Sequence, residues 1–520
     1  MTDSIFIGGG GPDHKLPQTL LLARSNRHGL VAGATGTGKT VTLQVMAEQF
    51  SAAGVPVFCA DVKGDLSGIC VAGTPEGKML EKFNERAGQI GLPGLTYSAA
   101  PCIFWDLYGT RGHPIRATVS EMGPQLLARM LGCNETQEGV ITIAFQYADD
   151  NDLLLLDFKD LRSLLTHIST ISGEIQRTYG NVAPASIGAV QRQLLMLERE
   201  GAPQFFGEPA LDLNDFMRVD TQGRGYISVL DATTLINSPR LYSTFLLWLL
   251  AELFEQLPEV GDPDKPKLVF FFDEAHLLFD GAPKALVDKI EQVVRLIRSK
   301  GVGVYFVTQN PKDLPESVLA QLGARIQHAL RAYTPTERKA VKAAAQSFRP
   351  NPDLDTETAI TELGTGEALV SSLDANGAPT VVQRTLIRPP MSRLGPAPDA
   401  DRAAVQAQSP VALKYDAVID RESAYEILTG REAIAAKEKD ALKRAEAAEA
   451  EAARARKEAS QAAAANRTQA STRASTTRAA APRKSTRQTP AEAAQSTFMR
   501  TATRELTKFV FRGMFGNRKR

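Results

Sequence analysis

The sequence contains 520 residues, of which 43% are hydrophobic and 23% charged, and its formal net charge is +1. Residues 459–520 carry 13 lysines and arginines against two glutamates, a surplus of +11 that leaves the first 458 residues at −10. An acidic body excludes a protein that coats nucleic acid with its whole surface. We expect a soluble protein, because its apolar runs are too short to span a bilayer. The absence of C-x-x-C pairs suits a cytoplasmic protein.

Two short strands, predicted at residues 5–7 and 20–22, precede an apolar run and the first chemical motif. The motif is a full match to the phosphate-loop pattern G-x-x-x-x-G-K-[ST], in the strand–loop–helix context that the pattern requires. We expect Lys39 to reach the β- and γ-phosphates of ATP, and Thr40 to bind Mg²⁺. The residues predicted to bind the nucleotide are Gly33, Ala34, Thr35, Gly36, Thr37, Gly38, Lys39, Thr40 and Val41.

The next predicted strand, at residues 55–61, runs into the polar turn Asp61-Val62-Lys63-Gly64-Asp65. We expect this turn to face the nucleotide, because the carboxyl ends of parallel strands carry the ligands of open α/β sheets. After a strand at residues 102–105, helical spacing of apolar residues predicts a helical insertion over residues 112–215. The sheet then resumes with a strand at residues 226–231.

Two adjacent carboxylates, Asp273 and Glu274, end the continuous apolar run that starts at residue 267. A run that is apolar on both faces is typical of a central strand in a parallel sheet. We expect Asp273 to hold Mg²⁺ and Glu274 to polarise the attacking water as a general base. The second carboxylate therefore predicts hydrolysis and not binding alone.

A further buried strand, from residue 303, ends at Gln309, a candidate for sensing the γ-phosphate or orienting the water. Arg295 and Arg298 lie on one face of the preceding helix, and Arg325 begins a later strand. Any of these three arginines is a candidate to reach the γ-phosphate bound by a neighbouring subunit. A solvated arginine on a helix face is the alternative for each.

Strands alternating with helices predict an α/β fold with a mainly parallel, doubly wound sheet, closed by strands at residues 367–371 and 379–383. Composition divides the chain into a core (1–390), a linker (391–421), a charged Ala-rich helix (422–458), a disordered basic segment (459–495) and a basic amphipathic helix (496–520). The last segment suits a partner protein, acidic lipid, DNA or the body of the chain itself.

Four motifs together resemble the HerA-like ATPases of the HerA/FtsK superfamily: the phosphate loop, the turn at residues 61–65, the Asp273-Glu274 strand and Val307-Thr308-Gln309-Asn310-Pro311. The resemblance covers roughly residues 5–390. It implies a RecA-like P-loop core, a hexameric ring with ATP between subunits, and DNA in the pore. It also implies that Lys39 and Thr40 bind phosphates and Mg²⁺, that Asp273 and Glu274 serve hydrolysis, and that Gln309 is the sensor. Arg298 occupies the place of the family's trans-acting arginine.

The first functional hypothesis is thus a Mg²⁺-dependent ATPase that moves DNA as a homo-oligomer. The alternative is an assembly or secretion-type ATPase whose substrate is a protein, with the basic tail binding a partner or an acidic membrane surface; the acidic body favours this alternative. A third possibility is a nucleotide switch that hydrolyses ATP only incidentally. Stimulation of turnover by DNA separates the first hypothesis from the other two.

Overall fold

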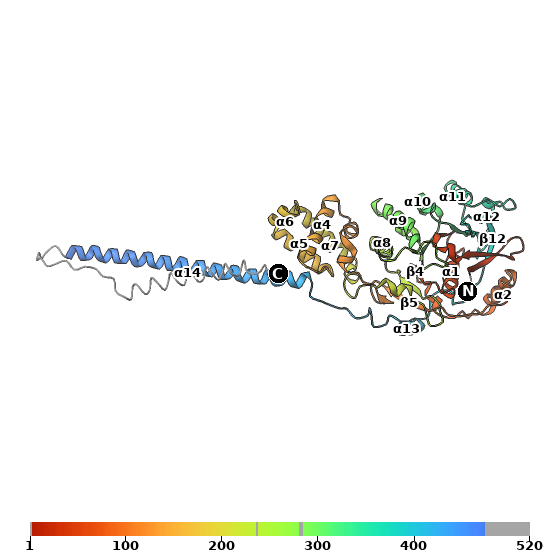
Figure 1. Ribbon diagram of the computed structural model, residues 1–520, viewed down its shortest axis with the longest axis horizontal. Coiled ribbons are helices and arrows are strands. Elements are labelled where there is room, and N and C mark those ends of the chain that lie inside the picture. Colours follow the sequence, from red (N-terminus) through yellow and green to blue (C-terminus); the bar gives the residue numbers. More distant parts are fainter. Residues whose placement is uncertain (1–2, 236–237, 280–283, 474–520) are drawn as a thin grey trace. The chain divides into compact units, whose positions relative to one another are not determined.

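The computed structural model describes residues 3–235, 238–279 and 284–473, and the chain divides into two compact units, residues 1–433 and 434–520 (Figure 1). The first unit contains one twelve-stranded sheet in the order β2-β1-β12-β11-β10-β3-β9-β8-β4-β7-β5-β6. The eight strands from β10 to β6 are parallel, while β2, β1, β12 and β11 extend the sheet in antiparallel pairs. The predicted α/β fold with a mainly parallel sheet is confirmed.

The strands span Ser4–Gly10 (β1), Leu16–Leu21 (β2), Gly29–Ala32 (β3), Val57–Asp61 (β4), Cys102–Asp106 (β5), His113–Pro114 (β6), Ile227–Asp231 (β7), Leu268–Phe272 (β8), Val302–Thr308 (β9), Ala324–Gln327 (β10), Glu367–Ser371 (β11) and Gln383–Ile387 (β12). The last strand was predicted at residues 379–383, but β12 begins only at Gln383. The residues before it bond with the preceding strand end instead, where Ser371 Oγ donates to Thr380 O.

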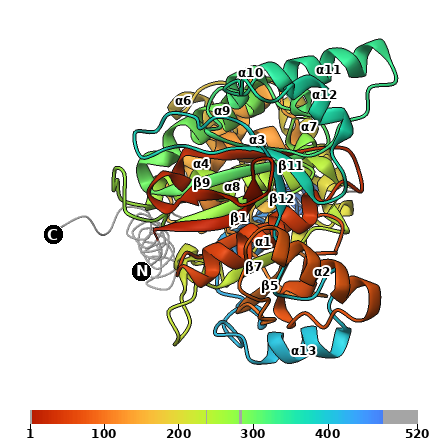
Figure 2. The ribbon, with the colours of Figure 1, turned by 90° about the vertical axis from the view of Figure 1, so that its right-hand side faces the viewer.

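Helices cover both faces of the sheet because its central strands are apolar on both faces. In β8, Phe270 and Phe272 enter one hydrophobic cluster, and Val269 and Phe271 enter the other. Helix α1 (Lys39–Ala52) packs into the second cluster, and α8 (Pro239–Gln256) and α9 (Lys284–Ile297) contribute to the first. Figure 2 shows α2 (Gly77–Gln89) and α13 (Asp399–Ala407) on the side opposite α9 and α10 (Glu316–Leu319).

Five helices lie within residues 112–215, where the helical insertion was predicted: α3 (Val119–Leu131), α4 (Glu135–Asp150), α5 (Phe158–Thr170), α6 (Ser172–Thr178) and α7 (Pro184–Arg199). Capping boxes at Thr118, Asn134 and Asp157 fix the starts of α3, α4 and α5. Their apolar faces join the same cluster as α8, so the insertion shares the core of the sheet. Helices α11 (Pro335–Gln346) and α12 (Thr356–Glu362) form a smaller cluster near β11.

Part of residues 391–421, the range predicted as a linker, packs against the rest of the first unit. Tyr415 is fully buried, its ring lies 5.3 Å from that of Trp105, and its hydroxyl donates to Asp215. Helix α14 (Ala424–Arg473) then begins in the first unit and continues in the second, beyond residue 458 where the Ala-rich helix was predicted to end. The rest of the predicted disordered segment and the helix at 496–520 lie outside the described residues. No helix in the described part of the chain combines the length and apolarity needed to cross a bilayer.

The buried side chain of His28, just before β3, makes the stability of the fold depend on pH. Its Nδ1 accepts a hydrogen bond of 3.0 Å from Val304 N in β9, and burial lowers its pKa to about 4. Because the unfolded chain takes up this proton near pH 6.5, the stability that neutral His28 contributes is present above pH 6.5 and is lost as pH falls toward 4.

We therefore predict that the free energy of unfolding depends less steeply on pH in the His28→Asn variant than in the wild type. Between pH 6.5 and 4, the slope should be smaller by roughly one bound proton. The amide oxygen of asparagine can accept from Val304 N in place of the imidazole nitrogen. Denaturant unfolding at a series of pH values measures the slope, and equal slopes in the two proteins would contradict the assignment.

Candidate active site

The phosphate loop joins β3 to α1 and is tied to its neighbours on both sides. Gly33 N donates to Thr308 O at 3.2 Å and Ala34 N to Ala329 O at 2.8 Å. Gly38, directly before α1, has a φ of 111°, and a Cβ there would lie 3.2 Å from Gly366 N, so glycine fits both the turn and the contact. The loop thus presents the first turn of α1 at the carboxyl edge of the sheet.

Lys39 is buried and turns back into its own loop, where Nζ donates to Gly33 O at 2.6 Å and to Ala34 O at 3.1 Å. Burial lowers the pKa of Lys39, and the charge of Lys63 lowers it further. The charges of Glu274 and Asp273 act in the opposite direction. The ammonium group therefore lies within electrostatic reach of the carboxylates at the end of β8.

Asp273 follows β8 and is 1% exposed, and its Oδ2 has no hydrogen-bond partner among the residues that the structure describes. Burial raises the pKa of Asp273 to about 6. A buried carboxylate oxygen without a partner is costly in free energy. A divalent cation would supply the missing partner, so the donor set fits the Mg²⁺ site predicted for Asp273 and Thr40.

Glu274 has a left-handed backbone, with a φ of 47°, and its carboxylate is held by residues from two other strand ends. Lys63 Nζ lies 2.6 Å from Oε1, and Gln309 Nε2 donates to Oε2 at 3.3 Å. Burial acts to raise the pKa of Glu274, but Lys63, with smaller contributions from Gln309 and His276, outweighs it and holds that pKa below its ordinary value. The structure thus brings together Glu274 and Gln309, two residues that the sequence predicted for one site.

Lys63 lies in the turn that the sequence places near the nucleotide, but sequence reasoning assigned this residue no role of its own. It belongs to the turn after β4, whose shape is set by Asp61: its carboxylate accepts from Gly64 N at 2.7 Å and from Leu66 N at 3.0 Å. Strand β4 pairs with β8 in parallel, with Ala60 opposite Phe272, so the turn lies beside the Asp273-Glu274 pair. The strand order is the signal that would have found Lys63, and it is not readable from the sequence.

The arginine candidates lie elsewhere. Arg295, Arg298 and Arg325 line one cavity of about 400 Å³ with Arg27 and His28. His28 precedes β3 and Arg298 precedes β9, so this cavity is at the amino ends of strands whose carboxyl ends carry the phosphate loop and Gln309. None of the three arginines joins the site of its own chain.

Besides a cavity of about 320 Å³ beside Ala34, Thr35 and Thr37, two more cavities border the phosphate loop. One, of about 420 Å³, is lined by Ala34, Thr35, Gln309 and His276, on the side of Glu274. The other, of about 550 Å³, begins at Gly38 and Val41 and is lined by Phe83, Arg86, Arg388 and two prolines. Arg86 Nη1 donates to Gly366 O at 3.0 Å, and Gly366 N donates to Thr37 O, which ties this second cavity to the phosphate loop.

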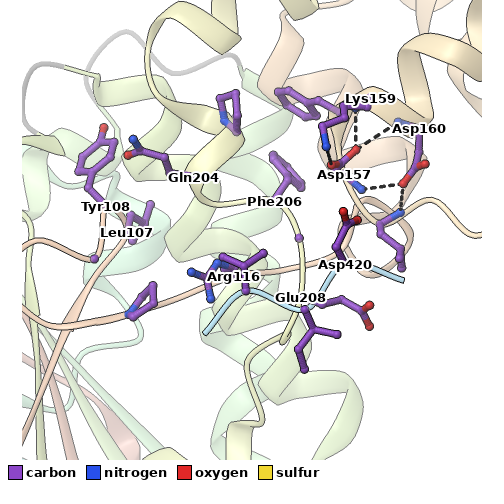
Figure 3. Close-up of a pocket in the computed structure, with 18 of the residues that line it drawn as sticks. Leu107, Tyr108, Arg116, Asp157, Lys159, Asp160, Gln204, Phe206, Glu208 and Asp420 are labelled. Atoms are coloured by element: carbon purple, nitrogen blue, oxygen red, sulfur yellow. Dashed lines mark hydrogen bonds and ion pairs between the residues drawn. The ribbon is translucent and has the colours of Figure 1, made fainter. Parts of the chain in front are cut away.

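A cavity larger than these, of about 860 Å³, lies between the insertion and the segment after α13 (Figure 3). Most of its carboxylates already have partners: Asp157 and Asp160 cap α5, and Glu208 forms an ion pair with Arg421. No phosphate-loop residue lines it, so size alone does not mark the active site here.

A family described as "Helicase HerA-like C-terminal" matches residues 10–520. The chain belongs to this HerA-like family. The resemblance seen in the sequence is confirmed, and this family member is a P-loop ATPase with the phosphate loop and paired carboxylates on adjacent strands of one sheet.

The chain is also similar to individual proteins of known sequence or structure. "Probable helicase MJECL08" of Methanocaldococcus jannaschii is 32% identical over 125 residues, which cover 23% of this chain and 22% of the relative. The plasmid coupling protein TrwB with the non-hydrolysable ATP analogue ADPNP has a TM-score of 0.50 at 15% identity, over 77% of this chain and 92% of TrwB, which shows a shared fold. VirB4 of Thermoanaerobacter pseudethanolicus has a TM-score of 0.46 at 14% identity, over 74% of this chain and 97% of VirB4.

Changing Glu274 to Gln tests its predicted role. We expect the variant to lose turnover by roughly 10²–10⁴-fold, because an amide cannot accept the proton of the attacking water. ATP binding should persist, because Glu274 lies beyond the phosphate loop. Steady-state phosphate release and equilibrium binding measure the two effects, with Glu81→Gln, an exposed carboxylate on α2, as the matched control. Turnover near the wild-type rate would contradict the role of general base.

Proposed function

We propose that this protein is a Mg²⁺-dependent ATPase that moves DNA as a homo-oligomeric ring, a hexamer as in the resemblance above. The observation that carries the proposal is the separation of the arginine cavity from the phosphate loop, at opposite ends of the same strands. A chain that holds the phosphates at one edge and its arginines at the other completes a hydrolysis site only against a second copy.

In this proposal, Thr40 and the Asp273 oxygen that lacks a partner among the described residues would hold Mg²⁺, which would neutralise phosphate charge. Lys39 leaves the carbonyl groups of its own loop for the β- and γ-phosphates. Glu274 accepts a proton from the attacking water, and Gln309 orients that water. The nucleoside lies in the cavity beyond Gly38 and Val41, whose lining includes neither Glu274 nor Gln309.

Among the arginines, Arg298 suits a trans-acting role better than Arg325. The Arg298 side chain is 41% exposed and pairs with Asp262, itself 40% exposed, at 3.2 Å. Such an exposed ion pair contributes little free energy and is readily exchanged for a phosphate. Arg325 is more enclosed and donates to Leu319 O of its own chain at 3.1 Å.

Co-expression of Arg298→Ala with Lys39→Ala subunits tests the shared site. Each variant alone should lose ATPase activity, because one lacks the arginine and the other the phosphate-loop lysine. Mixed rings should regain activity at about a quarter of the interfaces, where an intact phosphate loop meets an intact Arg298. The same mixture made with Arg325→Ala is the comparison. Hydrolysis that survives in the Arg298→Ala protein would contradict the role of Arg298.

DNA as the substrate is supported by the family assignment and by the helicase-like relative. We predict that double- or single-stranded DNA stimulates ATP hydrolysis at moderate salt, and that Lys39→Ala removes both the basal and the stimulated rate. Robust hydrolysis that is indifferent to DNA would contradict DNA translocation. It would favour the alternative, an ATPase acting on a protein partner, with the basic residues of 459–520 as the place to seek that partner.

A further inference from the structure

Lys63 makes the shortest contact to the catalytic carboxylate. Its Nζ lies 2.6 Å from Glu274 Oε1, while Gln309 Nε2 and His276 Nδ1 are each 3.3 Å from Oε2. Glu274 is nearly buried, at 6% side-chain exposure, but the Lys63 side chain is 38% exposed. The carboxylate is therefore fixed in place, whereas the lysine has room to move.

The shape of the turn does not depend on this ion pair. Asp61 already accepts from the backbone N–H groups of Gly64 and Leu66, and Gly64 adopts the left-handed φ of 77° that the turn requires. Removing the Lys63 ammonium group therefore leaves the backbone of residues 61–66 supported. The contact between Lys63 and Glu274 then needs another explanation.

The position of Lys63 relative to Lys39 supplies an explanation for its contact with Glu274. The charge of Lys63 acts on Lys39, and both ammonium groups lie near Asp273 and Glu274. Lys63 contacts the catalytic carboxylate and, because we expect Lys39 to meet the terminal phosphates, lies within electrostatic reach of the expected place of the γ-phosphate. A lysine carries a compact charge on a flexible four-carbon stem, which permits exchange between two neighbouring anions.

We propose that Lys63 is a positioning residue that exchanges partners, holding Glu274 when the site lacks a γ-phosphate and moving to the γ-phosphate when ATP is bound. This inference rests on the proposed role of Glu274. The move frees Glu274 Oε1 to accept a proton as the water oxygen bonds to the γ-phosphorus and the bond from that phosphorus to the bridging oxygen of ADP breaks. A terminal phosphate carries more negative charge than a carboxylate, so it competes for the ammonium group. ADP lacks that phosphate and leaves Lys63 on Glu274.

The test is a cycle of binding measurements with a non-hydrolysable ATP analogue and with ADP, each with Mg²⁺. Lys63→Met, which keeps the stem and removes the charge, should weaken binding of the analogue by about 10-fold or more and leave ADP binding within about twofold. Lys63→Arg should restore most of the preference for the analogue. Lys312→Met, an exposed lysine after β9, is the matched control.

Glu274→Gln completes the cycle. In the presence of Lys63 it should tighten binding of the analogue but not of ADP, because the ion pair no longer has to break. In the Lys63→Met background, Glu274→Gln should change the affinity for neither the analogue nor ADP. Equal affinities of wild type and Lys63→Met for both nucleotides would overturn the exchange and leave a purely structural ion pair. If instead Glu274→Gln retains turnover, the proposed function of Glu274 fails, which is a separate result.

Discussion

The parallel register of four neighbouring strands, β3, β9, β8 and β4, is the constraint on which the active site depends. Their pairing sets Ala32 beside Thr308, and Phe272 beside both Phe306 and Ala60. Each strand end then continues into a part of the candidate site: the phosphate loop, Gln309, the Asp273-Glu274 pair and the turn with Lys63. Four segments that are far apart in the sequence meet at one edge because carboxyl ends of parallel strands share an edge.

The hydrophobic packing makes this register costly to change. Alternate residues of β4, β8 and β9 fill two separate clusters, so a slip by one residue would move each side chain to the wrong face. The same packing allows buried charges at the edge: Asp273, Glu274 and Lys39 are each at most 5% exposed. They are tolerated there because opposite charges and loop carbonyl groups surround them. The amino ends of the strands carry the arginine cavity, and this division suits a site shared between copies.

Much of the site was predictable because its motifs are contiguous. The phosphate loop and the apolar strand before Asp273 each carry their own local signal, and the alternation of strands and helices predicted the sheet. Lys63 was not assigned because its partner, Glu274, depends on the strand order, which no local pattern encodes. The burial of Tyr415 was likewise unpredictable, since the polar composition of its segment indicates a linker while its ring packs on Trp105. The arginines were recognised as candidates, but their place at the opposite edge follows only from the fold.

The most direct test is an experimental structure of the full-length protein with Mg²⁺ and a non-hydrolysable ATP analogue. We predict the triphosphate on the backbone of residues 33–41, the metal bound to Asp273 and Thr40, and the nucleoside in the cavity lined by Phe83. Arg298 of a neighbouring copy should approach the γ-phosphate. A triphosphate bound away from residues 33–41, or a metal without Asp273 as a ligand, would contradict the account.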